Sequence, residues 1–219
     1  MDDAQTRGMG RLAIAAGVVA AGSAVCLATY FVVGGPFGTI NDVGNAATGL
    51  LSAALAWRLR GQASGRAKDL ALVAAIAGAA ITVVGSALVV SGATGFFLAG
   101  LVSSVGFAGI GTWLVVINRS GHPVHAWPGR LRWLGVLGGG LMVLGVVALP
   151  GVLLGLDDMD AAPAWVWIGF LGWLGIYVVY PAWAIWLGIL ETRQARRSLP
   201  SGEHDDRNEG TEARSWTGG

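Results

Sequence analysis

The chain has 219 residues, 54% of them hydrophobic and only 12% charged, and its formal net charge is +1. Soluble domains carry about 25% charged residues, so this composition argues against a water-facing globular domain and indicates a membrane protein. Cys26 is the only cysteine, which excludes an intramolecular disulfide, a CxxC redox pair and a thiolate metal cluster.

Six segments are apolar and long enough, or nearly so, to cross a hydrocarbon core about 30 Å thick. The sequence therefore predicts an all-α fold, a polytopic transmembrane helical bundle of six spans. A polar tail follows the last span; it can bury too little apolar surface to fold alone and is expected to be disordered. The predicted segments are 1–11 (N-terminus), 12–33, 39–57, 70–90, 95–117, 131–154 and 164–190 (spans), and 191–219 (tail).

The basic residues near the spans all lie on one side of a six-span arrangement. They precede the first span, join the second to the third and the fourth to the fifth, and follow the sixth, whereas the other three connections contain no lysine or arginine. The positive-inside rule assigns the cationic side to the cytoplasm. We therefore expect both termini in the cytoplasm. The excess of arginine over lysine and of small apolar residues favours the cell membrane of a bacterium with a GC-rich genome.

Tryptophans fall near the ends of the predicted spans, where an aromatic belt meets the lipid headgroups. At the cytoplasmic ends these residues are Trp57, Trp113, Trp133, Trp183 and Trp186. We expect them to be membrane anchors rather than parts of a ligand cage.

Small residues recur at four-residue spacing, as in Ala71, Ala75 and Ala79 and in Gly135 and Gly139. Membrane helices associate through close packing of such residues, so these positions are expected at helix–helix contacts.

The connection between the first two spans, residues 34–45, is the most informative stretch. For the second span to cross the core it must begin near residue 38 or 39, which places Asp42 about one helical turn inside and Asn45 about two. An ionisable residue within a span is a functional hypothesis by default. The alternative is a helix cap, because Asp and Asn are favoured at the N-cap and the helix dipole stabilises a carboxylate there. The sequence leaves both interpretations open.

Other polar residues fall at a comparable depth in later spans. We hypothesise that they converge with Asp42 on an outward-facing pocket that binds a small polar or cationic group. Tyr177 belongs to an aromatic stripe and lies near mid-membrane, where its hydroxyl needs a partner, although serine and threonine can instead bond to their own helix carbonyls. The candidate ligand-binding residues are Asn41, Asp42, Asn45, Thr82, Ser86, Ser103, Ser104 and Tyr177.

Several chemistries lack the residues they require. No histidine lies in a predicted span, and no P-loop, GxSxG or HExxH motif is present. His122 and His125 have no cysteine or nearby carboxylate to complete a metal site. We expect no catalytic residue, metal or cofactor, and no nucleic-acid partner; the expected partners are membrane lipids and, as an alternative, another membrane protein.

In length, topology and the stretch from Phe37 to Asn45, the chain resembles uncharacterised six-span integral membrane proteins of bacteria. The resemblance implies a helical membrane bundle and carries over no functional residue. Three functions stay open. A non-enzymatic accessory or interaction subunit is favoured by the short loops, a small-solute or lipid carrier would use the pocket around Asp42, and a lipid- or quinone-modifying enzyme would rely on Asp42, Asn45 and Tyr177.

Overall fold

The computed structural model describes residues 3–62, 66–120 and 127–197. His122, His125 and the end of the predicted tail, from residue 198, lie outside these ranges. The described residues are helical and include no strand. The first long helices are α1 (Asp3–Val33), α2 (Phe37–Leu59), α3 (Arg66–Val90) and α4 (Phe96–Arg119), with a short 3-10 turn, η1 (Arg60–Gln62), after α2.

The last two long helical stretches are interrupted midway. The fifth consists of α5 (Gly129–Val143), the 3-10 segment η2 (Leu144–Ala148) and α6 (Leu149–Leu153). The sixth consists of α7 (Val166–Leu174), the π-helical segment η3 (Gly175–Val179) and α8 (Tyr180–Arg197). η2 packs against α7 and η3 packs against α5, so each irregular segment lies against the other interrupted stretch.

Five helical stretches are long and apolar enough to cross a membrane: Arg7–Val33, Arg66–Val90, Phe96–Arg119, Gly129–Leu153 and Val166–Arg196. By length and composition, the prediction of a multi-pass helical membrane protein is confirmed. α2 is not among the five, because polar residues lower its hydropathy. Its 23 residues nevertheless extend for about 34 Å at 1.5 Å per residue.

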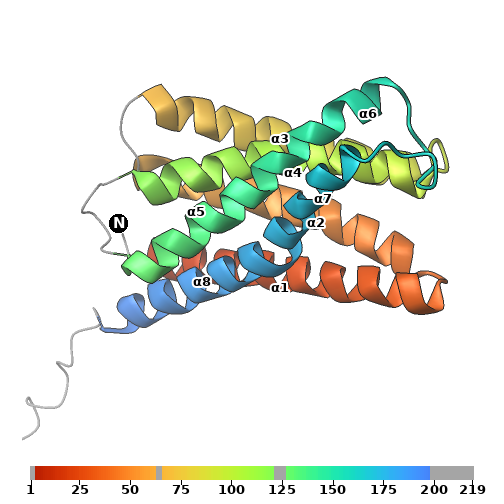
Figure 1. The fold of residues 1–219 in the computed structure, drawn as a ribbon. Helices are drawn as coiled ribbons and strands as arrows, with labels where there is room; N and C mark the ends of the chain where they lie inside the picture. The colour runs from red at the N-terminus through yellow and green to blue at the C-terminus, as the bar shows by residue number, and fades with distance from the viewer. Residues whose placement is uncertain (1–2, 63–65, 121–126, 198–219) are drawn as a thin grey trace, which may run out of the picture.

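The long helices run side by side along a common direction (Figure 1). Each packs against its neighbours in the sequence from α1 to α5, and the bundle closes where α8 lies along α1 and also contacts α5. Of the five apolar stretches, α4 is the most enclosed by protein.

Glycines bring helix backbones into direct contact. A Cβ atom added to Gly139 of α5 would lie 2.6 Å from the carbonyl oxygen of Gly111 and 2.9 Å from the amide nitrogen of Val115, both on α4. The three alanines that were predicted to share a face of α3 are buried as well. Small residues at four-residue spacing therefore mark helix–helix contacts, as expected from the sequence.

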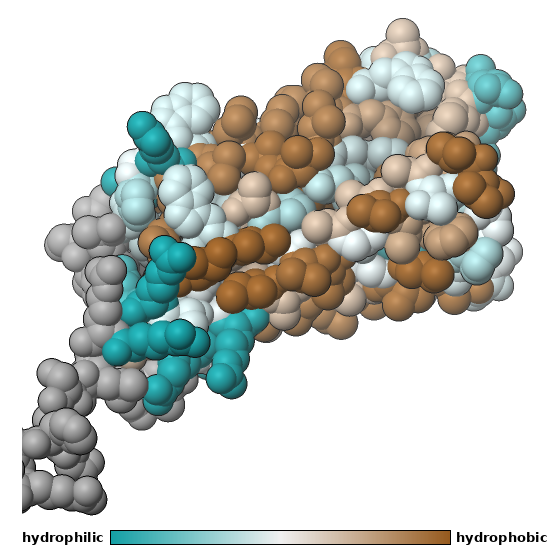
Figure 2. Space-filling view, turned by 90° about the horizontal axis from the view of Figure 1, so that it is seen from below, coloured by the Kyte–Doolittle hydropathy of each residue, from teal (hydrophilic) through white to brown (hydrophobic). Residues whose placement is uncertain are grey.

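The described cations gather at one end of the bundle, where α1, α3 and α5 begin and α2, α4 and α8 end (Figure 1). Figure 2 shows hydrophilic side chains at this end, beside the grey residues, and a mainly hydrophobic surface along the rest of the visible face. We call the end where these cations gather the cationic end. At the opposite end, Asp157 accepts hydrogen bonds from the amides of Gly95 (2.6 Å) and Leu98 (3.1 Å) and so caps α4.

The anchor interpretation is wrong for two of the tryptophans. Trp113 and Trp183 are only 3% and 0% exposed, and their rings meet edge to face at 6.1 Å in the core. Burial is possible because the Nε1 of Trp183 finds an acceptor inside the bundle, the Oδ1 of Asn118 at 3.2 Å. Trp57 and Trp133, by contrast, are 54% and 69% exposed, as anchors should be.

Both helical ends extend further than the predicted spans. α1 begins at Asp3, within the predicted N-terminal segment, and α8 continues to Arg197, within the predicted tail. α8 continues because its last turns pack inside the bundle: Glu191 is buried, and Thr192 lies so close to α1 that a Cβ atom on Gly10 would be 2.6 Å from its hydroxyl oxygen.

Candidate functional site

α2 places its polar face inside the bundle. Asn41, Asn45, Thr48 and Ser52 recur at helical spacing and are all buried, whereas the exposed large side chains of the helix are apolar: Ile40, Val43, Leu50 and Trp57. This orientation is the reverse of that of a helix on a soluble protein. It fits a helix whose surroundings are apolar and whose polar groups must find partners within the protein.

Tyr177, in the π-helical segment, reaches this polar face. Its hydroxyl donates to the Oδ1 atoms of Asn45, at 3.0 Å, and Asn41, at 3.3 Å. A hydroxyl has one proton for these two acceptors, so at least one amide oxygen is left with spare accepting capacity. π-helical turns within α-helices often occur at functional sites, and this one contributes the tyrosine of the cluster.

Asp42 lies beside these amides and is only 8% exposed. Its Oδ1 is 3.5 Å from the Nδ2 of Asn41, and within the described ranges no other hydrogen bond or ion pair reaches it. The nearest cation on the same helix is Arg58, about 24 Å away along the helix axis at 1.5 Å per residue. The cluster therefore carries a carboxylate that no cation of the described chain neutralises.

The cap interpretation of Asp42 is wrong. Pro36 occupies the N-cap of α2 and the helix begins at Phe37. Proline has its φ angle already fixed near the helical value, so the helix starts one turn before the carboxylate and Asp42 falls in its second turn. A capping side chain accepts hydrogen bonds from the free amides of the first helical turn, and in α2 that turn precedes Asp42.

Two more hydroxyls at the level of the cluster lack partners within the described ranges. The Oγ1 of Thr48 and the Oγ of Ser86 are buried and have no hydrogen-bond partner among the described residues. Ser86 reaches the level of Asn45 because Thr82, one turn earlier on α3, packs next to Gly49, one turn later on α2: a Cβ atom on Gly49 would be 3.4 Å from the Cβ of Thr82. Buried hydroxyls without partners are unusual and call for an explanation.

The structure does not bring all of the predicted residues together. Thr82 donates to the carbonyl oxygen of Gly78 at 3.0 Å and packs between α2 and α4. Ser103 faces α3, where a Cβ atom on Gly85 would be 2.6 Å from its hydroxyl. Ser104 faces α7 and accepts a hydrogen bond from the Nε1 of Trp173 at 3.0 Å. The candidate site thus consists of Asn41, Asp42, Asn45 and Tyr177, bordered by Thr48 and Ser86.

Sequence reasoning missed several buried polar residues outside this cluster. Ser52 and Tyr180 share a hydrogen bond of 2.6 Å. Near the cationic end, the Oε1 of Glu191 accepts from the Nε1 of Trp127 at 3.1 Å, while its buried Oε2 has no hydrogen-bond partner among the described residues. The sequence could have indicated Glu191, because this residue directly follows the predicted end of the sixth span at residue 190 and continues its helical face.

The arrangement offers acceptor oxygens and one negative charge to a ligand. The described residues contain no group of three or more His, Cys, Asp or Glu that could hold a metal ion. The acceptor oxygens and the carboxylate of the cluster suit a hydrogen-bond donor or a cationic group.

Comparison with protein-family models, with curated proteins and with solved structures finds no match to this chain. The fold itself defines the class of the protein, a multi-pass helical membrane protein.

Proposed function

We propose that the chain crosses the cell membrane six times, with both termini in the cytoplasm. In this topology α2 crosses the membrane in addition to the five apolar stretches. Two features support this topology. α2 lies between α1 and α3 in the bundle and exposes apolar side chains, and only a crossing by α2 leaves all the described cations at one end.

The topology can be tested with single cysteines in a Cys26→Ser background. Ser91, in the connection between α3 and α4, is exposed, and a Cβ atom on Gly61 would contact nothing, so both positions tolerate cysteine. A membrane-impermeant maleimide should label Ser91→Cys in intact cells and Gly61→Cys only after lysis. If α2 does not cross, the two results are exchanged, because α3 would then run in the opposite direction.

Within this topology we propose that the chain is a binding protein or carrier for a small solute with a cationic or hydrogen-bond-donating group. The observation that carries the proposal is the Asp42 carboxylate, buried beside the amide oxygens of Asn41 and Asn45 with no cationic partner in the described part of the chain. A buried charge is costly unless it is paired. A positively charged ligand would supply the missing partner, and the spare acceptors would orient it.

The irregular helices also favour binding over a purely structural role. Membrane carriers often form their sites at interrupted helices, where backbone groups become available to a ligand. Here the π-helical segment carries Tyr177, and Pro181, which lacks an amide proton, lies two residues after its end. The accessory-subunit and enzyme interpretations stay predictions from the sequence.

The test compares Asp42→Asn with Asp160→Asn, a matched control on an exposed carboxylate at the same end of the bundle. Guanidinium, methylammonium and choline serve as probes, with thermal stability of the purified protein as the readout. We expect at least one probe to stabilise the native chain, and Asp42→Asn to weaken its binding about 30-fold or more, as loss of a buried charge partner does. Asp160→Asn should have no effect.

A second measurement separates binding from structure. Because no cation of the described residues pairs with Asp42, Asp42→Asn should leave the ligand-free protein as stable as the native chain or make it more stable. Native mass spectrometry of gently extracted protein completes the comparison. A small molecule lost in Asp42→Asn alone supports the carrier proposal, whereas a protein subunit retained by both variants, with no small molecule on either, supports the accessory role instead.

A further inference from the structure

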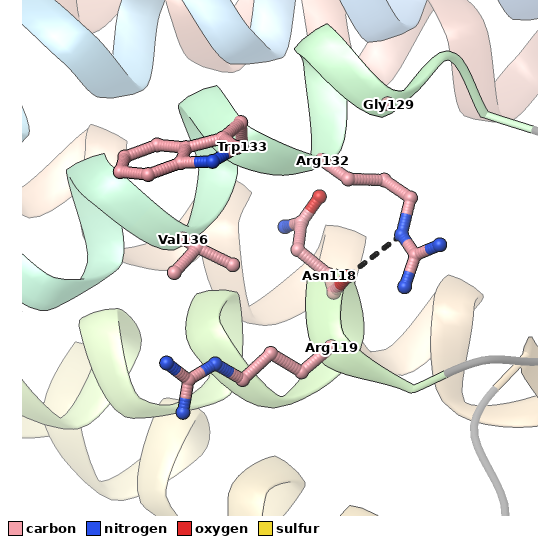
Figure 3. A pocket seen from close by; sticks show the side chains of 6 residues that line it. All are labelled: Asn118, Arg119, Gly129, Arg132, Trp133 and Val136. Carbon is pink, nitrogen blue, oxygen red and sulfur yellow. Dashed lines mark hydrogen bonds between the residues drawn. The ribbon is translucent and has the colours of Figure 1, made fainter.

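A hollow of about 460 Å³ opens between the end of α4 and the start of α5, at the cationic end of the bundle. Small-molecule sites typically measure about 300–1,000 Å³, so the hollow is large enough for a ligand. Figure 3 shows the side chains that line it from both helices. They are Asn118, Arg119, Gly129, Arg132, Trp133 and Val136.

The hollow carries two positive charges and no carboxylate among these lining residues. Arg132, on α5, is held in place because its Nε donates to the carbonyl oxygen of Asn118 at 2.9 Å. Its two terminal nitrogens bond to none of the described residues. Arg119 is exposed, and no hydrogen bond or ion pair joins its side chain to the described residues. In Figure 3 the two guanidiniums lie on opposite sides of Asn118.

Apart from Asn118 and the two arginines, the lining is apolar and continues onto the outer surface of α5. Trp133 is 69% exposed, and Leu137, one turn further along the helix, is 43% exposed. An exposed tryptophan beside arginines at the end of a membrane-crossing helix marks the level of the lipid headgroups. The hollow therefore joins a cationic site to a surface that faces acyl chains.

From this combination we propose that the groove between α4 and α5 binds the headgroup of an anionic phospholipid, with the phosphodiester between Arg119 and Arg132 and an acyl chain along Trp133 and Leu137. Guanidinium groups bind phosphate oxygens through charge-assisted hydrogen bonds. Basic pockets between membrane helices on the cytoplasmic side are suited to such headgroups.

A free phosphate ion shares the recognised chemistry, but the structure favours the lipid. The exposed apolar surface next to the hollow would give a free ion nothing to contact, whereas it would stabilise a lipid tail. This site lies at the end of the bundle opposite to Asp42 and is independent of the solute-binding proposal.

The test uses the full chain in nanodiscs that contain equal amounts of phosphatidylglycerol and phosphatidylcholine, followed by native mass spectrometry of the lipids retained on the ejected protein. Arg119→Gln and Arg119→Gln/Arg132→Gln are compared with Arg130→Gln. Arg130 is a matched control, because it is exposed on the same turn of α5 and does not line the hollow.

We expect the native protein and Arg130→Gln to retain phosphatidylglycerol in preference to phosphatidylcholine. Each cation near a membrane surface contributes about fivefold to the binding of anionic lipid, so the preference should fall about fivefold in Arg119→Gln and about 25-fold in the double variant. Arg119→Gln removes no described hydrogen bond and so keeps the test valid if loss of Arg132 disturbs the fold.

Two results would overturn the proposal. Equal preference for phosphatidylglycerol in Arg119→Gln and Arg130→Gln would show that the lipid binds elsewhere. Loss of the preference in the native protein when inorganic phosphate is present in large molar excess would show that the groove recognises a free anion rather than a lipid.

Discussion

The hydrogen bond between Ser52 and Tyr180 predicts an unequal effect of removing its two partners. The Oγ of Ser52 lies 2.7 Å from the carbonyl oxygen of Thr48 and donates its only proton there. The hydroxyl of Tyr180, 2.6 Å away, must therefore be the donor to Ser52. Both side chains are 0% exposed, so no water can replace either partner.

Tyr180→Phe removes the donor and leaves Ser52 bonded to its own helix. We expect it to lower the free energy of unfolding by about 0.6 kcal/mol and at most about 1.7 kcal/mol, the range for hydrogen bonds between membrane helices. Ser52→Ala instead leaves the Tyr180 hydroxyl as a buried donor without an acceptor. That should lower the free energy of unfolding by about 1–3 kcal/mol.

The double variant Ser52→Ala/Tyr180→Phe restores balance, because neither polar group remains. Its destabilisation should be close to that of Tyr180→Phe alone and smaller than the sum of the two single effects by more than about 0.5 kcal/mol, the limit for independent sites. Equilibrium unfolding in mixed micelles of dodecyl sulfate, followed by circular dichroism, measures all three. Thr29→Val, at an exposed hydroxyl bonded to its own helix, is the control and should change little.

An additive double variant, or a Ser52→Ala variant that is no less stable than Tyr180→Phe, would refute the assignment of donor and acceptor.

Three further predictions rest on single contacts and use the same unfolding measurement. Gly139→Ala should destabilise the bundle by about 1–3 kcal/mol, because its Cβ would overlap the α4 backbone. In the control Gly140→Ala nothing lies near the added atom, so stability should change by less than about 1 kcal/mol. Equal effects of the two substitutions would contradict the packing. Asp157→Ala removes the cap of α4 and should cost about 0.5–2 kcal/mol, with Asp157→Asn losing less. Asn118→Ala leaves the indole of Trp183 without its acceptor and should cost about 1–3 kcal/mol; a neutral result would mean that another acceptor replaces it.

Hydropathy along the chain predicted the helical segments well because membrane helices must be long and apolar. It placed Asp42 inside the second helix, about one turn from its start, as in α2, and it identified Tyr177 as a buried hydroxyl in need of a partner. What decided between cap and site was Pro36, which starts α2 a full turn before the carboxylate. A proline six residues before Asp42 is thus the sequence feature that favours an internal position for the carboxylate.

The remaining differences come from the direction in which side chains point. Trp113 and Trp57 both lie near the cationic end of their helices, yet one is 3% exposed and the other 54%. Position along a helix sets depth, whereas rotation about its axis, which depends on packing against neighbours, sets burial. For the same reason Ser103 and Ser104, adjacent in sequence and similar in depth, face α3 and α7 and do not join the candidate site.

The inward polar face of α2 also bears on how the protein is made. In the proposed topology, this helix would enter the bilayer during synthesis with Asp42 and its amides still unpartnered, and an aspartate in a lone inserting helix costs as much as about 2.5–3.5 kcal/mol at the bilayer centre. α2 therefore depends on contacts with neighbouring helices during biogenesis. If α2 left the translocon alone, it would remain at the interface between membrane and water. Its stable insertion would require α1 beside it and α3, which is synthesised after it.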